Sequence, residues 1–169
     1  AVRMLFEVLA LVGLMISMQM GLSAAMMNDP ASGDAVSVLS QLFWVMTALL
    51  FFALNGHLIS LQIMVDSFSL WPVGASLYQL DLMLLVNLFG WMFGAALLVA
   101  MPGIIAMLLV NLTFGIATRS APSLNIFVLG FPMNMVLGFV CVYLTVVQTG
   151  HRFSGMINDM LNNLYLLMR

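Results

Sequence analysis

The chain has 169 residues, of which 64% are hydrophobic and 6% are charged, and its mean hydropathy is +1.17. A soluble globular domain needs more polar side chains to cover its surface, so the composition predicts a protein of a membrane or of a membrane-embedded assembly. The formal net charge is -2 and Lys is absent, which argues against a nucleic-acid partner and against a polybasic lipid anchor.

The first predicted element is an apolar helix over residues 4–22. Gly13, Ser17 and Gly21 repeat a small residue every four positions, a spacing that lets another helix approach closely. The chain begins at Ala1, just before this apolar run, without an initiator Met or a signal-peptide pattern. We therefore expect the whole protein to contain a preceding segment.

The longest polar interval follows at residues 23–41, and we expect it to be a loop. Asn28, Asp29 and Pro30 are turn formers, and Asp34 or Ser37 is a suitable cap for the next helix. Methionines crowd the entrance of this loop, and the flexible Met side chain adapts to irregular contacts. A solvated connector is the alternative interpretation.

Residues 42–65 are interrupted by Asn55, Gly56 and His57, which leaves apolar arms of about 13 and 8 residues, too short to cross a core roughly 30 Å thick. Residues 83–101 can span, and Gly90 and Gly94 form a GxxxG step for helix packing in them. Pro102 is expected to end or kink that helix, which would leave a short helix at 104–117 and another helix at 124–147.

The pattern predicts an all-α membrane protein of broken helices and helical hairpins, packed against protein neighbours in an oligomeric assembly. The whole chain, 1–169, is one domain in this interpretation. Apolar residues from Phe153 to Met168 form one stripe, which predicts a separate amphipathic terminal helix over residues 151–169.

Residues 114–132 combine Arg119 with Pro122 and Pro132 inside apolar sequence. An Arg at mid-membrane depth costs roughly 3 kcal/mol on insertion scales, so this segment needs shelter in protein or beside water. The alternative is a connecting loop in the headgroup region.

Enzyme and transporter chemistry find little support in these residues. An intramembrane hydrolase would use Ser23 with His57 or His151, but no glycine elbow or oxyanion-hole signature accompanies them. An ion-coupled transporter would use Glu7, Asp66 or Asp81 inside the bundle. The two His and the lone Cys141 lack metal-site spacing, and Cys141 is expected to be a small buried hydrophobe.

Three stretches resemble the FliR family of flagellar type III export-gate proteins. They are QMGLSAAMMNDPASG, FFALNGHLISLQIMVDSFSLWP and GIATRSAPSLNIFVLGFP, and they occur in the family's order over most of the chain. The chain is similar to roughly the last two-thirds of a family member. The injectisome counterpart SctT shares the Arg119, Pro122 and Asn125 pattern, whereas the NGH turn and Gly130-Phe131-Pro132 favour the flagellar branch. A small-solute transporter is the alternative from another class.

The resemblance implies a subunit that is not an enzyme, has no cofactor or metal, and lies in the cytoplasmic membrane at the flagellar basal body. It implies a ring-like helical gate formed with FliP and FliQ, contacts with FlhB and FlhA and with membrane lipid, and passage of unfolded flagellar substrates through the centre.

The resemblance also implies roles for particular residues. Residues 20–36 match an inward loop that plugs the closed gate, here called the plug segment; its named residues are Met20, Gly21, Met26, Met27, Asn28, Asp29 and Pro30. A second set would support hairpins and assembly, and consists of Asn55, Gly56, His57, Arg119, Pro122, Asn125, Gly130 and Pro132. The sequence departs from the family pattern at Ser123, where Gln is usual, and at Asn134, where Lys is common.

Overall fold

The computed structural model describes residues 2–22, 27–28, 35–70, 82–120 and 126–168. They form five helices, α1 (Val2–Gln19), α2 (Val38–Ala53), α3 (Gly56–Leu70), α4 (Leu82–Ser120) and α5 (Ile126–Met168), and two short strands, β1 (Met27–Asn28) and β2 (Ala35–Val36). The prediction of an all-α membrane protein is confirmed, with one small addition. The strand pair lies within the segment that was expected to be a loop, and α2 begins at Val38, before the expected loop end at Gln41.

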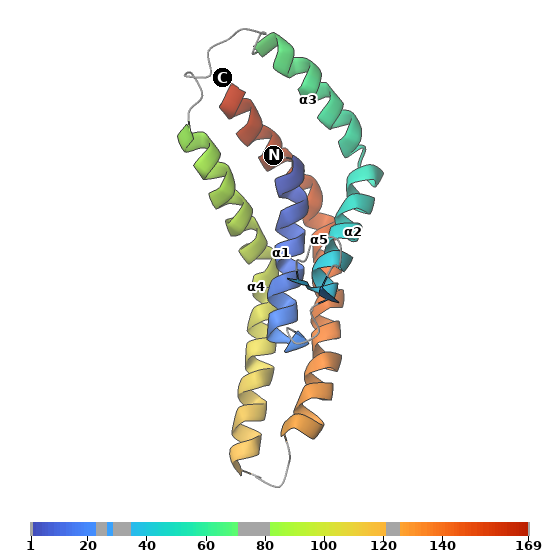
Figure 1. The fold of residues 1–169 in the computed structure, drawn as a ribbon, viewed down its shortest axis with the longest axis vertical. Helices are drawn as coiled ribbons and strands as arrows, with labels where there is room; N and C mark the ends of the chain where they lie inside the picture. The colour runs from blue at the N-terminus through green and yellow to red at the C-terminus, as the bar shows by residue number, and fades with distance from the viewer. Residues whose placement is uncertain (1, 23–26, 29–34, 71–81, 121–125, 169) are drawn as a thin grey trace.

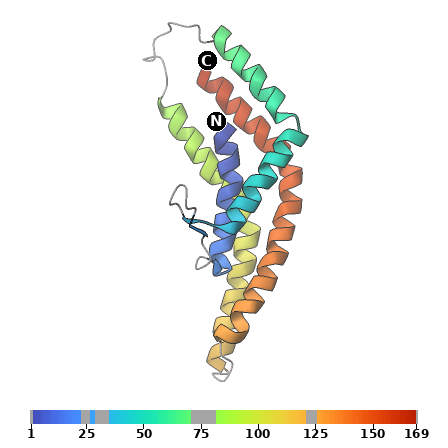
Figure 2. The ribbon, with the colours of Figure 1, turned by 45° about the vertical axis from the view of Figure 1, so that its right-hand side comes forward.

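Helices α4 and α5 form an antiparallel pair that runs the length of the molecule (Figure 1). Helix α1 packs against α2, α4 and α5 and lies between the two long helices over the middle of the molecule (Figures 1 and 2). Both ends of the chain lie near the same end of the long axis (Figure 1). Because α1 packs against three other helices, it forms the centre of the core.

The contact between α1 and α2 explains one of the small residues in the first helix. A Cβ at Gly13 would stand 2.6 Å from the carbonyl oxygen of Leu39 and 2.9 Å from the Phe43 ring. Leu9 and Phe43 are fully buried beside this contact, and the Ser40 hydroxyl donates a hydrogen bond of 2.7 Å to the Ala10 carbonyl. Gly13 thus allows the two backbones to approach, as the four-residue spacing predicted.

The predicted interruption at Asn55, Gly56 and His57 is confirmed. Helices α2 and α3 meet at this point with a bend of 73°. Asn55 has a φ of 56°, a left-handed conformation that Asn tolerates better than most residues. The side chain of Phe51 occupies the space where a Cβ on Gly56 would lie. Each of the two residues is therefore suited to its place in the turn.

The helix end expected at Pro102 is wrong, because Pro102 lies inside α4. Pro132 lies inside α5, as it does in the helix predicted over residues 124–147. No separate short helix exists at 104–117, and residues 151–168 are the last part of α5. A proline inside a helix removes one hydrogen bond and costs about 3 kcal/mol. Around Pro102 that cost is offset by packing, because Val99, Ala100 and Met107 of α4 are buried in the core.

The two long helices far exceed the thickness of a bilayer. Helices α4 and α5 have 39 and 43 residues, which correspond to about 58 and 64 Å of helix, against roughly 30 Å of hydrocarbon. The expectation of several helices shorter than a membrane span thus holds only for the pair α2 and α3.

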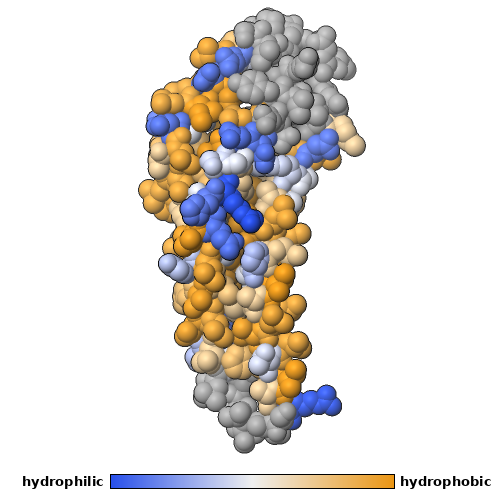
Figure 3. Space-filling model, turned by 180° about the vertical axis from the view of Figure 1, so that it is seen from behind, coloured by the Kyte–Doolittle hydropathy of each residue, from blue (hydrophilic) through white to orange (hydrophobic). Residues whose placement is uncertain are grey.

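Much of the apolar surface is not covered by the chain itself. Among the described residues, three helices are long and apolar enough to cross a membrane, and the bent pair α2–α3 gives a fourth span if it counts as one. Only 28% of the most apolar window of α4 and of α5 is buried. Figure 3 shows the hydrophobic surface on one face of the molecule. Apolar patches of this extent are typical of surfaces that contact lipid or protein.

Candidate functional site at the end of the first helix

The plug segment begins where α1 ends, and the backbone there has a defined geometry. The Met20 amide donates a hydrogen bond of 3.0 Å to the Ile16 carbonyl, and the Gly21 amide donates one of 3.1 Å to the Met18 carbonyl. Gly21 has a φ of 75°, the left-handed conformation in which glycine commonly ends a helix. The chain therefore leaves the α1 axis at Gly21.

Met20 is fixed in the core by a space that Gly138 leaves open. Its side chain is fully buried, which stabilises the fold by about 1.5–3 kcal/mol relative to an exposed position. A Cβ on Gly138 of α5 would overlap the Met20 side chain at its Cγ, Sδ and Cε atoms. Met20 and Gly138 are thus complementary in shape, and we call this pair the Met20 seat.

A chain of amide groups joins the end of α1 to both long helices. The Asn111 Nδ2 atom on α4 donates to the Gln19 carbonyl at 3.2 Å. The Asn134 Nδ2 atom on α5 in turn donates to the Asn111 Oδ1 atom at 2.6 Å. Polar side chains among apolar helices are costly unless they bond to one another, so this arrangement fixes the position of α1 relative to α4 and α5.

Beyond the seat, the plug segment contains the strand pair β1–β2. It is antiparallel, with Met27 opposite Val36 and Asn28 opposite Ala35. Figure 2 shows it to one side of the helices. Among the predicted plug residues, Met26, Asp29 and Pro30 lie outside the described residues. Ser37 occupies the N-cap position of α2, but its hydroxyl makes no capping hydrogen bond.

The described assembly residues fall in two places, the turn between α2 and α3 and the end of the molecule where α4 ends and α5 begins (Figure 1). Asn55 is exposed, Gly56 is buried, and the buried Nδ1 atom of His57 has no hydrogen-bond partner. Arg119 is exposed in the last turn of α4, near carbonyl groups whose partial negative charge favours a cation. This position agrees with the end of a helix beside a connection and not with an Arg sheltered inside the bundle.

The remaining assembly and packing residues are on the two long helices. Gly130 is buried and Pro132 is exposed on α5, whereas Pro122 and Asn125 lie outside the described residues. Gly90 and Gly94 are exposed on α4, and a Cβ at either would meet nothing within 4 Å. Their predicted role in helix packing would therefore require a surface from outside this chain.

Sequence reasoning missed the residues that fix the end of α1. Asn111 and Asn134 are isolated polar residues within apolar sequence. A polar side chain inside a membrane costs free energy unless it has a hydrogen-bond partner, and this cost was the signal that could have identified them. Gly138 follows Asn134 by four residues in apolar sequence, and its neighbours in the chain give no indication of a partner. Its contact with Met20 joins residues 118 positions apart in the chain, a relation that no local pattern contains.

Of the residues considered for catalysis or ion transport, Ser23 and Asp81 lie outside the described residues. Glu7 accepts a hydrogen bond of 3.4 Å from Arg3, and the two side chains are 41% and 91% exposed, so Glu7 is not inside the bundle. No three His, Cys, Asp or Glu residues of the described segments come together as metal ligands. Cys141 is buried, as expected.

Long apolar helices around a central α1 define a helical membrane protein, and comparison with known proteins identifies its family. Residues 1–160 match the family described as bacterial export proteins, family 1, and the chain belongs to this family.

Similar proteins in several bacteria share one name. The chain is 37% identical to the flagellar biosynthetic protein FliR of Escherichia coli over 134 residues, which cover 79% of this chain and 51% of that protein. It is 32% identical to the FliR of Pectobacterium carotovorum, over 83% of this chain and 54% of that protein. The FliR of Bacillus subtilis is 28% identical, over 97% of this chain and 66% of that protein. The chain thus spans about half the length of the first two relatives.

Proposed function

We propose that this chain is part of a core subunit of the flagellar type III export gate in the cytoplasmic membrane. Together with FliP and FliQ it forms the channel through which unfolded flagellar proteins leave the cytoplasm, and FlhB and FlhA bind on the cytoplasmic side. The observation that carries the proposal is the family match over residues 1–160, accompanied by similarity to FliR proteins.

The shape of the chain supports a role within an assembly. Helices of about 58 and 64 Å extend beyond a single bilayer, and most of their apolar surface is exposed in the chain by itself. Subunits packed around a common axis would cover that surface. Gly90 and Gly94 on α4 offer a face without side chains, where the backbone of a neighbouring helix fits.

The plug segment is the part of the chain that closes the gate in this proposal. The Met20 seat and the amide chain through Asn111 and Asn134 hold its first residue in place, while the residues beyond Gly21 obstruct the passage until export begins. Opening then requires movement of residues after the seat and leaves α1 in the core.

Co-purification tests the assignment to the gate. The tagged full-length protein, extracted from a flagellated bacterium in mild detergent, should elute with FliP and FliQ, and its deletion should abolish motility without slowing growth. A protein that is stable and active in solute transport as a single species would contradict the proposal.

The plug assignment has its own test. Replacing Met26 and Met27 by Gly should make membranes that contain the closed complex permeable to small solutes, because the flexible side chains that seal the passage are lost. The matched control replaces Met64 and Met133, two exposed methionines outside the plug segment. Equal permeability in both variants and in the wild type would count against the plug.

A further inference from the structure

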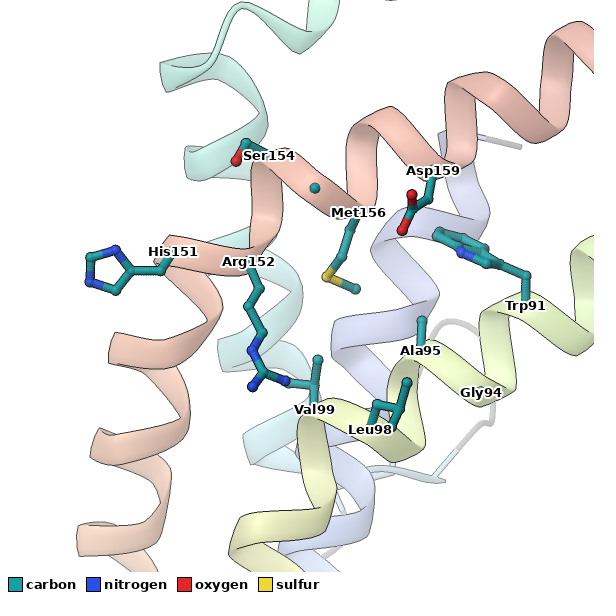
Figure 4. A pocket seen from close by; sticks show the side chains of 11 residues that line it. Trp91, Gly94, Ala95, Leu98, Val99, His151, Arg152, Ser154, Met156 and Asp159 are labelled. Carbon is teal, nitrogen blue, oxygen red and sulfur yellow. The ribbon is translucent and has the colours of Figure 1, made fainter.

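A groove between α4 and α5 lies away from the Met20 seat. It has a volume of about 630 Å³ and lies between residues 91–99 of α4 and 151–159 of α5. Figure 4 shows its walls, with Trp91, Ala95 and Leu98 on one side and Arg152, Met156 and Asp159 on the other. A cavity of this size is within the range of small-molecule sites.

The floor of the groove is apolar. Val99 and Met156 are buried at its base, and Trp91 is half-buried in its wall. Gly155 on α5 also lines the groove and has no side chain to fill it, and a Cβ there would meet nothing within 4 Å. The lining is therefore suited to hydrocarbon.

Two opposite charges lie on the same wall. Arg152 and Asp159 both line the groove and are seven residues apart on α5, about two helical turns or 10 Å. In Figure 4 the Arg152 side chain reaches toward Val99, and the Asp159 carboxylate lies near Trp91. Neither side chain forms a salt bridge with another described residue, so neither charge of the groove is neutralised there.

The groove lies near the ends of two candidate membrane spans. Its α4 residues are at the start of the span Val86–Ala117, and its α5 residues are at the end of the span Pro132–Leu161. On the rear face in Figure 3, hydrophilic patches lie among hydrophobic surface from the middle of the molecule upward, and the surface below the middle is mostly hydrophobic. A groove at the ends of two membrane spans would lie at the boundary between lipid headgroups and acyl chains.

We propose that the groove binds an aminophospholipid of the phosphatidylethanolamine class. The lipid phosphate accepts hydrogen bonds from the Arg152 guanidinium, and the ammonium group donates to the Asp159 carboxylate. One acyl chain lies on the apolar floor that Val99 and Met156 form. Guanidinium and carboxylate groups form strong charge-assisted hydrogen bonds with such partners. Free phosphate would leave the apolar floor uncovered and would be repelled by Asp159.

Lipid retention tests the proposal. The tagged full-length protein is extracted from membranes in polymer-bounded nanodiscs, exchanged into detergent, and exposed to vesicles of phosphatidylethanolamine, phosphatidylcholine or phosphatidylglycerol, or to inorganic phosphate alone. Bound lipid is then measured by mass spectrometry. We expect phosphatidylethanolamine to be retained over phosphatidylcholine, whose quaternary ammonium has no proton to donate to Asp159.

Variants of the two charged residues should change retention in different ways. Arg152→Gln should weaken retention of phosphatidylethanolamine about tenfold, the effect of losing one charge-assisted hydrogen bond, and Arg152→Lys should restore part of it. Asp159→Asn should shift the preference toward phosphatidylglycerol, whose headgroup has no ammonium. The matched control is Arg3→Gln, since Arg3 is exposed on α1; it should change nothing.

Filling the groove gives a test that leaves its charges intact. Gly155→Phe on α5 places a ring in the groove, where the acyl chain would lie, and should displace the lipid while FliP and FliQ still co-purify. Unchanged retention in Arg152→Gln or Gly155→Phe, or an equal loss in Arg3→Gln, would overturn the proposal. So would a protein segment found in the groove in place of lipid. Loss of co-purification in Gly155→Phe with no change in lipid would assign the groove to a subunit interface and also overturn the proposal.

Discussion

Replacing Gly138 by Ala tests whether the Met20 seat holds the end of α1. At an exposed helix position, a change from Gly to Ala stabilises the helix by about 0.5–1 kcal/mol. At Gly138 the new methyl group would overlap the fully buried Met20 side chain, and overpacking of this kind costs about 1–3 kcal/mol. The matched control is Gly150→Ala on the same helix, where a Cβ meets nothing within 4 Å.

We expect Gly138→Ala to have a free energy of unfolding about 1–3 kcal/mol lower than that of Gly150→Ala. The measurement is reversible unfolding of the full-length protein in bicelles by titration with a denaturing detergent. A double-mutant cycle with Met20→Ala separates the contact from other effects, because a shortened side chain removes the overlap.

Two results would refute the reasoning. One is an unfolding free energy of Gly138→Ala equal to that of Gly150→Ala. The other is a destabilisation by Gly138→Ala that persists when Met20 is already Ala, since the clash would then lie elsewhere.

Three further substitutions follow from the packing and the backbone. Gly13→Ala should cost about 3 kcal/mol of unfolding free energy, because its Cβ meets the Leu39 backbone, which cannot rotate away; a cost near zero would show that α1 and α2 separate freely. Asn55→Gly should keep stability and Asn55→Val should lose about 1–2 kcal/mol in the same titration, because φ is 56° there. Gly90→Leu should preserve the unfolding free energy of the chain but reduce co-purification of FliP and FliQ; undiminished co-purification would argue against a neighbouring helix on this face.

The strongest predictions from sequence concerned properties that are carried by composition or by adjacent residues. A hydrophobic content of 64% with 6% charge leaves too few polar groups for a soluble surface, so the membrane class follows without any tertiary information. The break between α2 and α3 was also predictable, because Asn55 and Gly56 favour a turn through their own backbone preferences.

The same local reasoning failed at Pro102, which lies inside α4. A proline raises the free energy of a helix by a known amount, but the packing that offsets it comes from elsewhere in the chain. Around Pro102, buried residues of α4 pack into the core, and a Cβ at Gly103 would lie 3.6 Å from Ile16 of α1 and from Thr145 of α5. The helix propensity of proline predicts this cost, but it contains no information about the packing between distant residues that offsets it.

The sequence by itself determined the membrane class, the family and the sharp turn at Asn55, because each depends on overall composition, on ordered motifs or on one residue's backbone preference. Only the tertiary structure decided that α4 continues through Pro102, that α5 extends to Met168, and that Met20 lies against Gly138. It also decided that Asn111 joins the end of α1 to Asn134. These features depend on contacts between residues far apart in the chain, and their free energies exist only once the helices are packed.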